Sequence, residues 1–131
     1  CRTRVITSRF GQTRRGPWRN NSSRRPGCPS ASALVSPDLQ GRSSHGLLQL
    51  PVYLKRLKAK TIDPLGELEI LREGTAFAVC DAHCMLGHAA APQAMALTTR
   101  KARQAGIAAV SVRRGTHFGV AGRYARQAAE E

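Results

Sequence analysis

Two histidines stand where an imidazole could transfer protons. His117 lies in a short loop between an apolar run and a helix-like pattern, and His45 precedes a leucine-rich segment. Because the unperturbed pKa of imidazole is about 6.5, such side chains can take up or release a proton near neutral pH. Loops at the ends of buried strands are also where rigid scaffolds present catalytic groups. Proton transfer is therefore the predicted chemistry, with an ordinary structural role as the alternative for each histidine.

A second group of residues carries side chains that could bind zinc. Cys80, His83, Cys84 and His88 fall within nine positions. Zinc sites commonly take ligand pairs from separated segments, so that four side chains can reach tetrahedral geometry. Cys80 also ends an apolar run, where a cysteine behaves as a small buried hydrophobic residue. No metal site is therefore predicted.

Helical and strand patterns surround these side chains. Leucines and Tyr53 recur at helical spacing between residues 47 and 60, and Pro51 suits the first turn of that helix. Residues 67–73 and 75–80 partly alternate on either side of a Glu-Gly pair, which indicates a β-hairpin. The predicted order is thus a helix followed by two antiparallel strands.

The clearest helix is predicted between Pro92, near its start, and Gly106, just past its end. Residues 107–112 form a short apolar run that predicts a buried strand. Small and apolar residues form one stripe of the first helix and the inward face of a last helix: Ala94, Met95, Thr98, Ala102 and Ala105, then Val120, Tyr124 and Ala128.

Composition separates the chain into two parts. Its 131 residues suit one ordinary domain, and no apolar run approaches the roughly 18 residues that span a bilayer. Residues 1–36 hold eight arginines and no acidic residue, with many Ser, Pro and Gly, so a disordered basic arm is predicted there. Such a composition is typical of out-of-frame translation, whereas a nucleic-acid-binding arm, with Phe10 and Trp18 stacking on bases, is the alternative. The cysteines indicate no disulfide framework, so a reducing cytoplasm is expected.

Three segments of residues 37–131 resemble the malate/L-lactate dehydrogenase family. They are residues 38–57 with Ser-His-Gly, residues 102–125 with Gly-Ile and His-Phe-Gly, and the less similar residues 81–95. The resemblance implies an α/β fold around a mixed sheet that is not a Rossmann fold, and the chain has no Gly-x-Gly-x-x-Gly. It also implies that residues 37–131 are the N-terminal part of a longer domain, truncated at its C-terminal end.

The resemblance also implies roles for four side chains. His117 and His45 would be the two imidazoles of the catalytic site, one relaying the substrate proton and the other assisting, in an undecided order. Tyr53 would contact the substrate, although a tyrosine on an apolar helical stripe is equally expected in a core. Gln49 stands where the family has a carboxylate-binding arginine, and a neutral amide cannot offer a charged bidentate fork. Further departures are Ala82, Met85 and Arg114-Gly115 at expected turns.

The implied activity is hydride transfer between a 2-hydroxy acid such as malate or lactate and NAD or NADP. The family implies a homodimer and a small 2-hydroxy or 2-keto acid as the ligand, with no membrane partner. Cofactor-binding residues are expected downstream of Glu131, so the chain alone is expected to be inactive. A basic nucleic-acid-binding protein acting through residues 1–36 is the alternative from another class.

Overall fold

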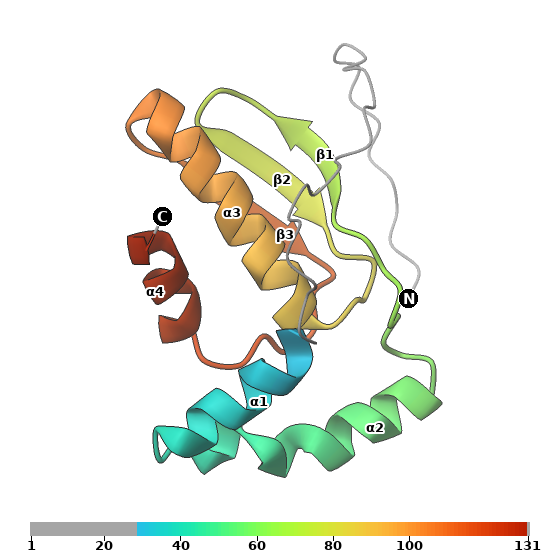
Figure 1. Ribbon diagram of the computed structural model, residues 1–131. Helices are drawn as coiled ribbons and strands as arrows, with labels where there is room; N and C mark the ends of the chain where they lie inside the picture. Colours follow the sequence, from blue (N-terminus) through green and yellow to red (C-terminus); the bar gives the residue numbers. More distant parts are fainter. Residues whose placement is uncertain (1–28, 131) are drawn as a thin grey trace.

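A three-stranded mixed sheet forms one layer of the computed structural model, which describes residues 29–130 (Figure 1). Strands β1 (Glu69–Glu73) and β2 (Phe77–Asp81) pair antiparallel, and the predicted hairpin is confirmed. Strand β3 (Ala109–Arg113) pairs parallel with β2, so the sheet has the order β1-β2-β3. Because parallel neighbours need a long crossover connection, a helix runs between them. The expected α/β class with a mixed sheet is confirmed.

That crossover is α3 (Gly87–Ala105), the longest helix of the described range. It ends as predicted at Gly106, whose φ of 79° is left-handed and whose N–H donates to the carbonyl of Ala102. It begins earlier than predicted, at Gly87, so Pro92 lies inside the helix, where its missing N–H removes one backbone hydrogen bond.

The buried face of α3 also differs from the predicted stripe. Ala90, Ala94, Leu97 and Lys101 are buried, at spacings of four, three and four residues, and only Ala94 belongs to that stripe. Leu97 packs on Ala78 and Cys80 of β2, and Cys80 is fully buried, as predicted for a small hydrophobic residue. The core therefore lies between α3 and one face of the sheet.

Helix α1 (Pro29–Leu39) corrects the predicted boundary of the basic arm. Residues 29–36 were expected to be disordered, but they are helical, and Ala33 and Leu34 are buried. Leu34 packs on Tyr53 and Ile62, so burial of its side chain offsets part of the entropy cost of ordering this segment. The remainder of the predicted arm, residues 1–28, lies outside the described residues.

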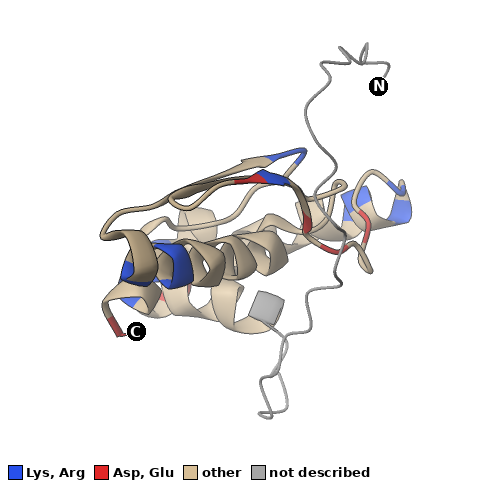
Figure 2. Ribbon diagram, turned by 90° about the horizontal axis from the view of Figure 1, so that it is seen from above, with Lys and Arg blue, Asp and Glu red and all other residues tan. Residues whose placement is uncertain are grey.

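The other helices flank this unit. Two short 3-10 turns (Ser43–His45 and Leu47–Gln49) lead into α2 (Leu50–Lys58), which confirms the helix predicted after His45. Seen from above, the sheet lies on one side of α3 and α4 (Gly122–Glu130) on the other (Figure 2). Tyr124 is the buried residue of α4, whereas Ala128 is exposed, so the predicted inward face is shorter than expected. No helix within residues 29–130 is long and apolar enough to cross a membrane.

Candidate functional site

His117 follows β3 in a loop that is fixed to the start of α3. The hydroxyl of Thr116 accepts a hydrogen bond from the N–H of Gly87 (3.0 Å) and donates one to the carbonyl of Met85 (3.2 Å). Gly87 permits this contact, since a Cβ there would lie 2.4 Å from the Thr116 carbonyl oxygen and 2.5 Å from that of His117. The His117 backbone is therefore held against α3.

The same loop is anchored by Asp81, at the end of β2. Its carboxylate has no exposed surface and accepts hydrogen bonds from Nε of Arg113 (2.7 Å) and Nε of Arg114 (2.8 and 2.9 Å). Burial alone would raise the pKa of Asp81, but hydrogen bonds from Arg114, from the His83 N–H and from Arg113 hold it far below the usual range. Arg114 adopts a left-handed φ of 51°, where a side chain is strained, and this ion pair stabilises it there. Asp81 thus joins the ends of two strands beneath the histidine loop.

A separate turn positions His45. The carboxylate of Asp38 accepts the N–H of Leu47 (2.8 Å), and the turn packs so closely that a Cβ at Gly46 would lie 2.1 Å from Asp38 Oδ1. Nδ1 of His45 is hydrogen-bonded to the Ser44 hydroxyl (3.0 Å). Asp38 and Gly46 therefore fix the backbone on either side of His45, and the Gly of Ser-His-Gly is required by this close approach.

Three side chains from distant parts of the sequence meet at this point. The hydroxyl of Tyr53 lies 2.6 Å from Nδ1 of His117, and the rings of His45 and His117 have centroids 5.8 Å apart. Tyr53 is buried, whereas His117 is exposed. The structure thus brings together His45, Tyr53 and His117, as expected for a shared site.

His88 is a fourth member of this group and was considered in the sequence only as a zinc ligand. It is 1% exposed, and its Nε2 lies 3.3 Å from the same Tyr53 hydroxyl. Its ring meets the Tyr53 ring edge-on, with centroids 5.3 Å apart. No motif or spacing in the sequence indicates that position 88 faces the His117 loop.

Burial is the main electrostatic influence on these groups. It lowers the pKa of His88 to about 4, with smaller contributions from His117 and Arg123. Burial also lowers the pKa of His117, assisted by the charges of His45 and Arg56, and it raises the pKa of Tyr53. Both imidazoles are therefore neutral at pH 7, as a group that accepts a proton must be.

Gln49 makes a contact within its own turn. Its side-chain Nε2 donates to the carbonyl of Ser44 (2.8 Å), next to His45. The amide therefore supports the His45 turn from the position where the family has a carboxylate-binding arginine. A substrate-binding role for Gln49 stays a prediction.

His83, one of the residues considered for zinc, is held by other contacts. Nε2 of His83 lies 2.8 Å from a carboxylate oxygen of Glu69, and its Nδ1 lies 2.7 Å from an Arg114 nitrogen. These partners fit a neutral ring that donates from Nε2 and accepts at Nδ1. Among residues 29–130, no group of three or more His, Cys, Asp or Glu side chains could hold a metal ion.

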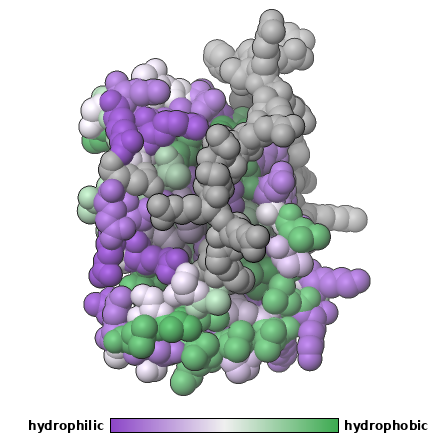
Figure 3. Space-filling view, in the orientation of Figure 1, coloured by the Kyte–Doolittle hydropathy of each residue, from purple (hydrophilic) through white to green (hydrophobic). Residues whose placement is uncertain are grey.

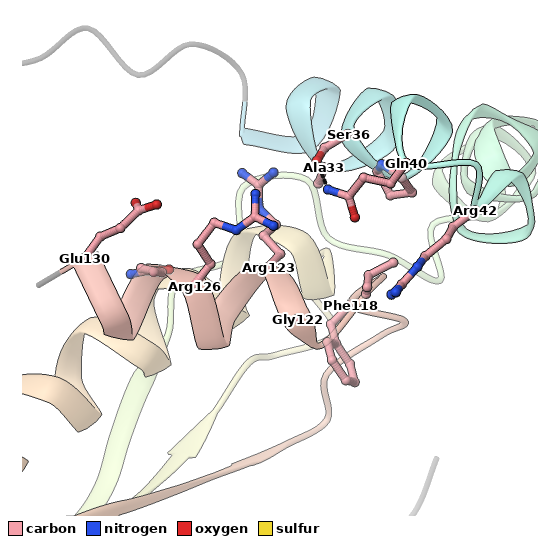
Figure 4. Close-up of a pocket in the computed structure, with 12 residues that line it drawn as sticks. Ala33, Ser36, Gln40, Arg42, Phe118, Gly122, Arg123, Arg126 and Glu130 are labelled. Atoms are coloured by element: carbon pink, nitrogen blue, oxygen red, sulfur yellow. Dashed lines mark hydrogen bonds between the residues drawn. The ribbon is translucent and has the colours of Figure 1, made fainter.

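A cationic cavity of about 400 Å³ adjoins the histidine loop between α1 and α4 (Figure 4). Arg42, Arg123 and Arg126 line it, together with Phe118, the residue after His117. One acidic residue, Glu130, shares this lining. Because planar guanidinium groups bind carboxylate and phosphate well, the cavity suits an anionic group.

An apolar groove of about 520 Å³ runs between α3 and β3, and Phe118 lines both this groove and the cationic cavity. Its lining includes Gly87, Ala90, Ala94, Met95, Thr98, Val110, Val112, Phe118 and Tyr124. Such a groove could receive a flat ring, but no glycine-rich phosphate-binding turn follows a strand within the described range. The described residues therefore supply no cradle of this kind for the phosphates of a nicotinamide dinucleotide.

Comparison with known proteins identifies the family. Residues 23–131 match the family model described as malate/L-lactate dehydrogenase. The chain is 37% identical over 99 residues to the L-sulfolactate dehydrogenase of Methanocaldococcus jannaschii and 39% identical over 101 residues to the malate dehydrogenase of Pyrococcus abyssi. These alignments cover 76% and 77% of the chain but only 29% and 28% of the relatives.

Solved structures agree with this assignment. The sulfolactate dehydrogenase from Methanocaldococcus jannaschii superposes with a TM-score of 0.74 at 36% identity, covering 76% of this chain and 29% of that one. The malate dehydrogenase from Pyrococcus horikoshii gives a TM-score of 0.75 at 34% identity, covering 78% and 29%. The matched family model and the shared fold agree, and the chain belongs to the malate/L-lactate dehydrogenase family.

Proposed function

We propose that this chain forms the proton-transfer part of an oxidoreductase that moves a hydride between a 2-hydroxy acid, such as malate or lactate, and NAD or NADP. The observation that carries the proposal is the meeting of His45, Tyr53 and His117, with the Tyr53 hydroxyl 2.6 Å from His117 Nδ1. A dehydrogenase of this kind needs a neutral base beside the substrate hydroxyl, and the lowered pKa of His117 provides one.

In this proposal each residue has a separate task. As hydride leaves C2 of the 2-hydroxy acid, the hydroxyl O–H bond breaks and its proton goes to a ring nitrogen of His117. Tyr53 holds the other nitrogen of that ring, and His45 assists from the neighbouring turn. The nicotinamide cofactor, when bound, supplies the hydride acceptor.

The substrate carboxylate requires a cation or strong hydrogen-bond donors. Gln49 is neutral and bound to Ser44, so the electrostatic attraction would come from the arginine cavity beside Phe118. Arg42 in that cavity lies three residues before His45 in sequence. This arrangement would attract a 2-hydroxy acid anion toward the histidine loop.

Further chain, and a second copy, would complete the active site. The chain spans under a third of the length of the relatives it matches, and we propose that it is inactive alone. The surface over α1 and α2 is rich in apolar side chains (Figure 3). Leu47, Leu48 and Leu54 are 50%, 73% and 48% exposed. Such a surface suits burial in a homodimer.

A chimera tests the proposal. Residues 29–131 would replace the matching segment of the Pyrococcus horikoshii malate dehydrogenase, which superposes on this chain with a TM-score of 0.75. Oxidation of malate, lactate and sulfolactate would be followed with NAD and with NADP. We expect activity toward at least one of these acids. A folded, dimeric chimera that oxidises none of them would contradict the proposal.

A further inference from the structure

We propose that His88 is a positioning residue that selects the tautomer of His117 through the hydroxyl of Tyr53. The inference rests on the proposed function, because it assumes that His117 exchanges a proton with the substrate. Its structural content, a coupling between two imidazoles through one phenol, can be measured without any catalytic assay.

The Tyr53 hydroxyl contacts both imidazoles. One oxygen, the Tyr53 hydroxyl, lies 2.6 Å from Nδ1 of His117 and 3.3 Å from Nε2 of His88. The two imidazole centroids are 6.1 Å apart. Gly119, with a left-handed φ of 81°, covers His88, since a Cβ there would lie 3.1 Å from Nε2. The buried His88 nitrogen therefore faces Tyr53 from a closely packed position.

The number of hydrogens on these three groups couples the two rings. A tyrosine hydroxyl carries one hydrogen, and each neutral imidazole has one N–H and one bare nitrogen. The hydroxyl can donate to only one of its two ring partners, so the other ring must donate to its oxygen. The two hydrogen bonds therefore run in the same direction, and the tautomer of His88 determines that of His117.

The surroundings of His88 keep it neutral. The charged or titratable groups that face it are His117 in the loop, Arg123 on α4 and Tyr53 on α2. Within the described range, no carboxylate forms an ion pair with His88. Protonation would thus place a cation in a buried site beside Arg123, and the two-tautomer count holds at neutral pH.

One of the two arrangements suits proton uptake. If Nε2 of His88 is bare, the Tyr53 hydroxyl donates to it and Nδ1–H of His117 donates to Tyr53. Nε2 of His117 then carries the lone pair that accepts the substrate proton. In the opposite arrangement that nitrogen already holds a hydrogen. We infer that His88 stabilises the first arrangement in the free protein.

Imidazole ¹⁵N NMR of the 131-residue chain tests this directly. At pH 7, His117 of the native chain should be mainly the Nδ1–H tautomer. His88→Leu removes the acceptor and should change the His117 tautomer ratio by about fivefold, the equivalent of one ordinary hydrogen bond. His88→Gln keeps a polar partner at the same reach and should restore most of the native ratio. His83→Gln, in the Glu69–Arg114 contact, is the matched control and should change nothing.

Tyr53→Phe and His88→Leu, singly and together, form a double-mutant cycle. Tyr53→Phe is the second single variant. It removes the connecting hydroxyl, so His88 can no longer influence His117, and adding His88→Leu to Tyr53→Phe should cause no further change in the His117 ratio. If His88→Leu does not fold, Tyr53→Phe must still alter the Nε2 resonance of His88. An unchanged His117 ratio in folded His88→Leu, or an unchanged His88 resonance in Tyr53→Phe, would overturn the inference. Coupling without dehydrogenase activity in the chimera would instead contradict only the proposed function.

Discussion

The hydroxyl of Tyr53 lies 2.6 Å from Nδ1 of His117, although 64 positions separate the two residues in the chain. Tyr53 belongs to the apolar face of α2, and His117 belongs to the loop that follows β3. The short contact joins the helical part of the described structure to the sheet. This hydrogen bond therefore positions the His117 ring, the proposed proton acceptor, relative to α2.

Acid should destabilise the fold through His88. The pKa of its buried ring is lowered to about 4 from an ordinary value of 6.5, so between these two pH values the unfolded chain binds a proton that the folded chain does not. The unfolding free energy should therefore fall by up to about 3 kcal/mol as the pH decreases from 6.5 to 4. Urea titrations along this pH series measure it, and His88→Gln should flatten the profile. An equally steep profile in that variant would contradict the assignment.

A second loss of stability should appear at lower pH through Asp81. Its pKa is far below the usual range, so its contribution is fully present above the unfolded value of 3.8 and is lost as the pH falls through the folded value. Asp81→Asn should cost about 1 to 3 kcal/mol at pH 7, because the two arginines lose their carboxylate but remain largely solvated. The variant should also lose less stability than the native chain below pH 4, and a parallel loss would refute this role.

Gly87→Ala should loosen the histidine loop. The new Cβ would meet backbone carbonyl oxygens at 2.4 and 2.5 Å, and neither atom can move without displacing Thr116 and His117. We expect a loss of about 1 to 3 kcal/mol in unfolding free energy, the usual effect of overpacking. Gly122→Ala is the control, since a Cβ at Gly122 meets nothing within 4 Å. Equal stability of the two variants would show that the close approach at Gly87 is unimportant.

Gln49→Arg should strengthen carboxylate binding in the chimera. Arginine at this position offers a bidentate charged fork, whereas the present amide donates to Ser44. The KM for malate should fall by about tenfold or more, as expected for a hydrogen bond to a charged group. Gln104→Arg adds the same charge at an exposed position of α3 and should leave KM unchanged. If both variants lower KM equally, only the net charge is responsible.

The sequence predicted which helices and strands form better than it predicted the residues at which they begin and end. The β-hairpin and the end of α3 at Gly106 follow from local turn chemistry, so pattern alone could find them. Helix α1 could not be found in this way, because its order depends on Leu34 packing against Tyr53 and Ile62, far along the chain. The early start of α3 likewise depends on Gly87 contacting the Thr116 loop.

The residues of the functional site were likewise only partly predictable from the sequence. His45, Tyr53 and His117 could be named from family motifs, and the structure brings them together. His88 was missed because no spacing rule relates position 88 to position 53. Ala82 and Met85, which differ from the family pattern at expected turns, are buried core residues. Arg114, which also differs from that pattern, does occupy a left-handed turn position.

The central claim is that His117 exchanges the substrate proton, and the turnover of the chimera with His117→Ala tests it most directly. General acid–base catalysis contributes about 10² to 10⁴-fold, so kcat should fall by at least about 100-fold. The fold should be kept, because His117 is exposed and its backbone is held by Thr116 and Gly87. His83→Ala removes a histidine whose side chain contacts Glu69 and Arg114, and this variant should keep the parent rate. A His117→Ala chimera that is folded and turns over malate as fast as its parent would contradict the account.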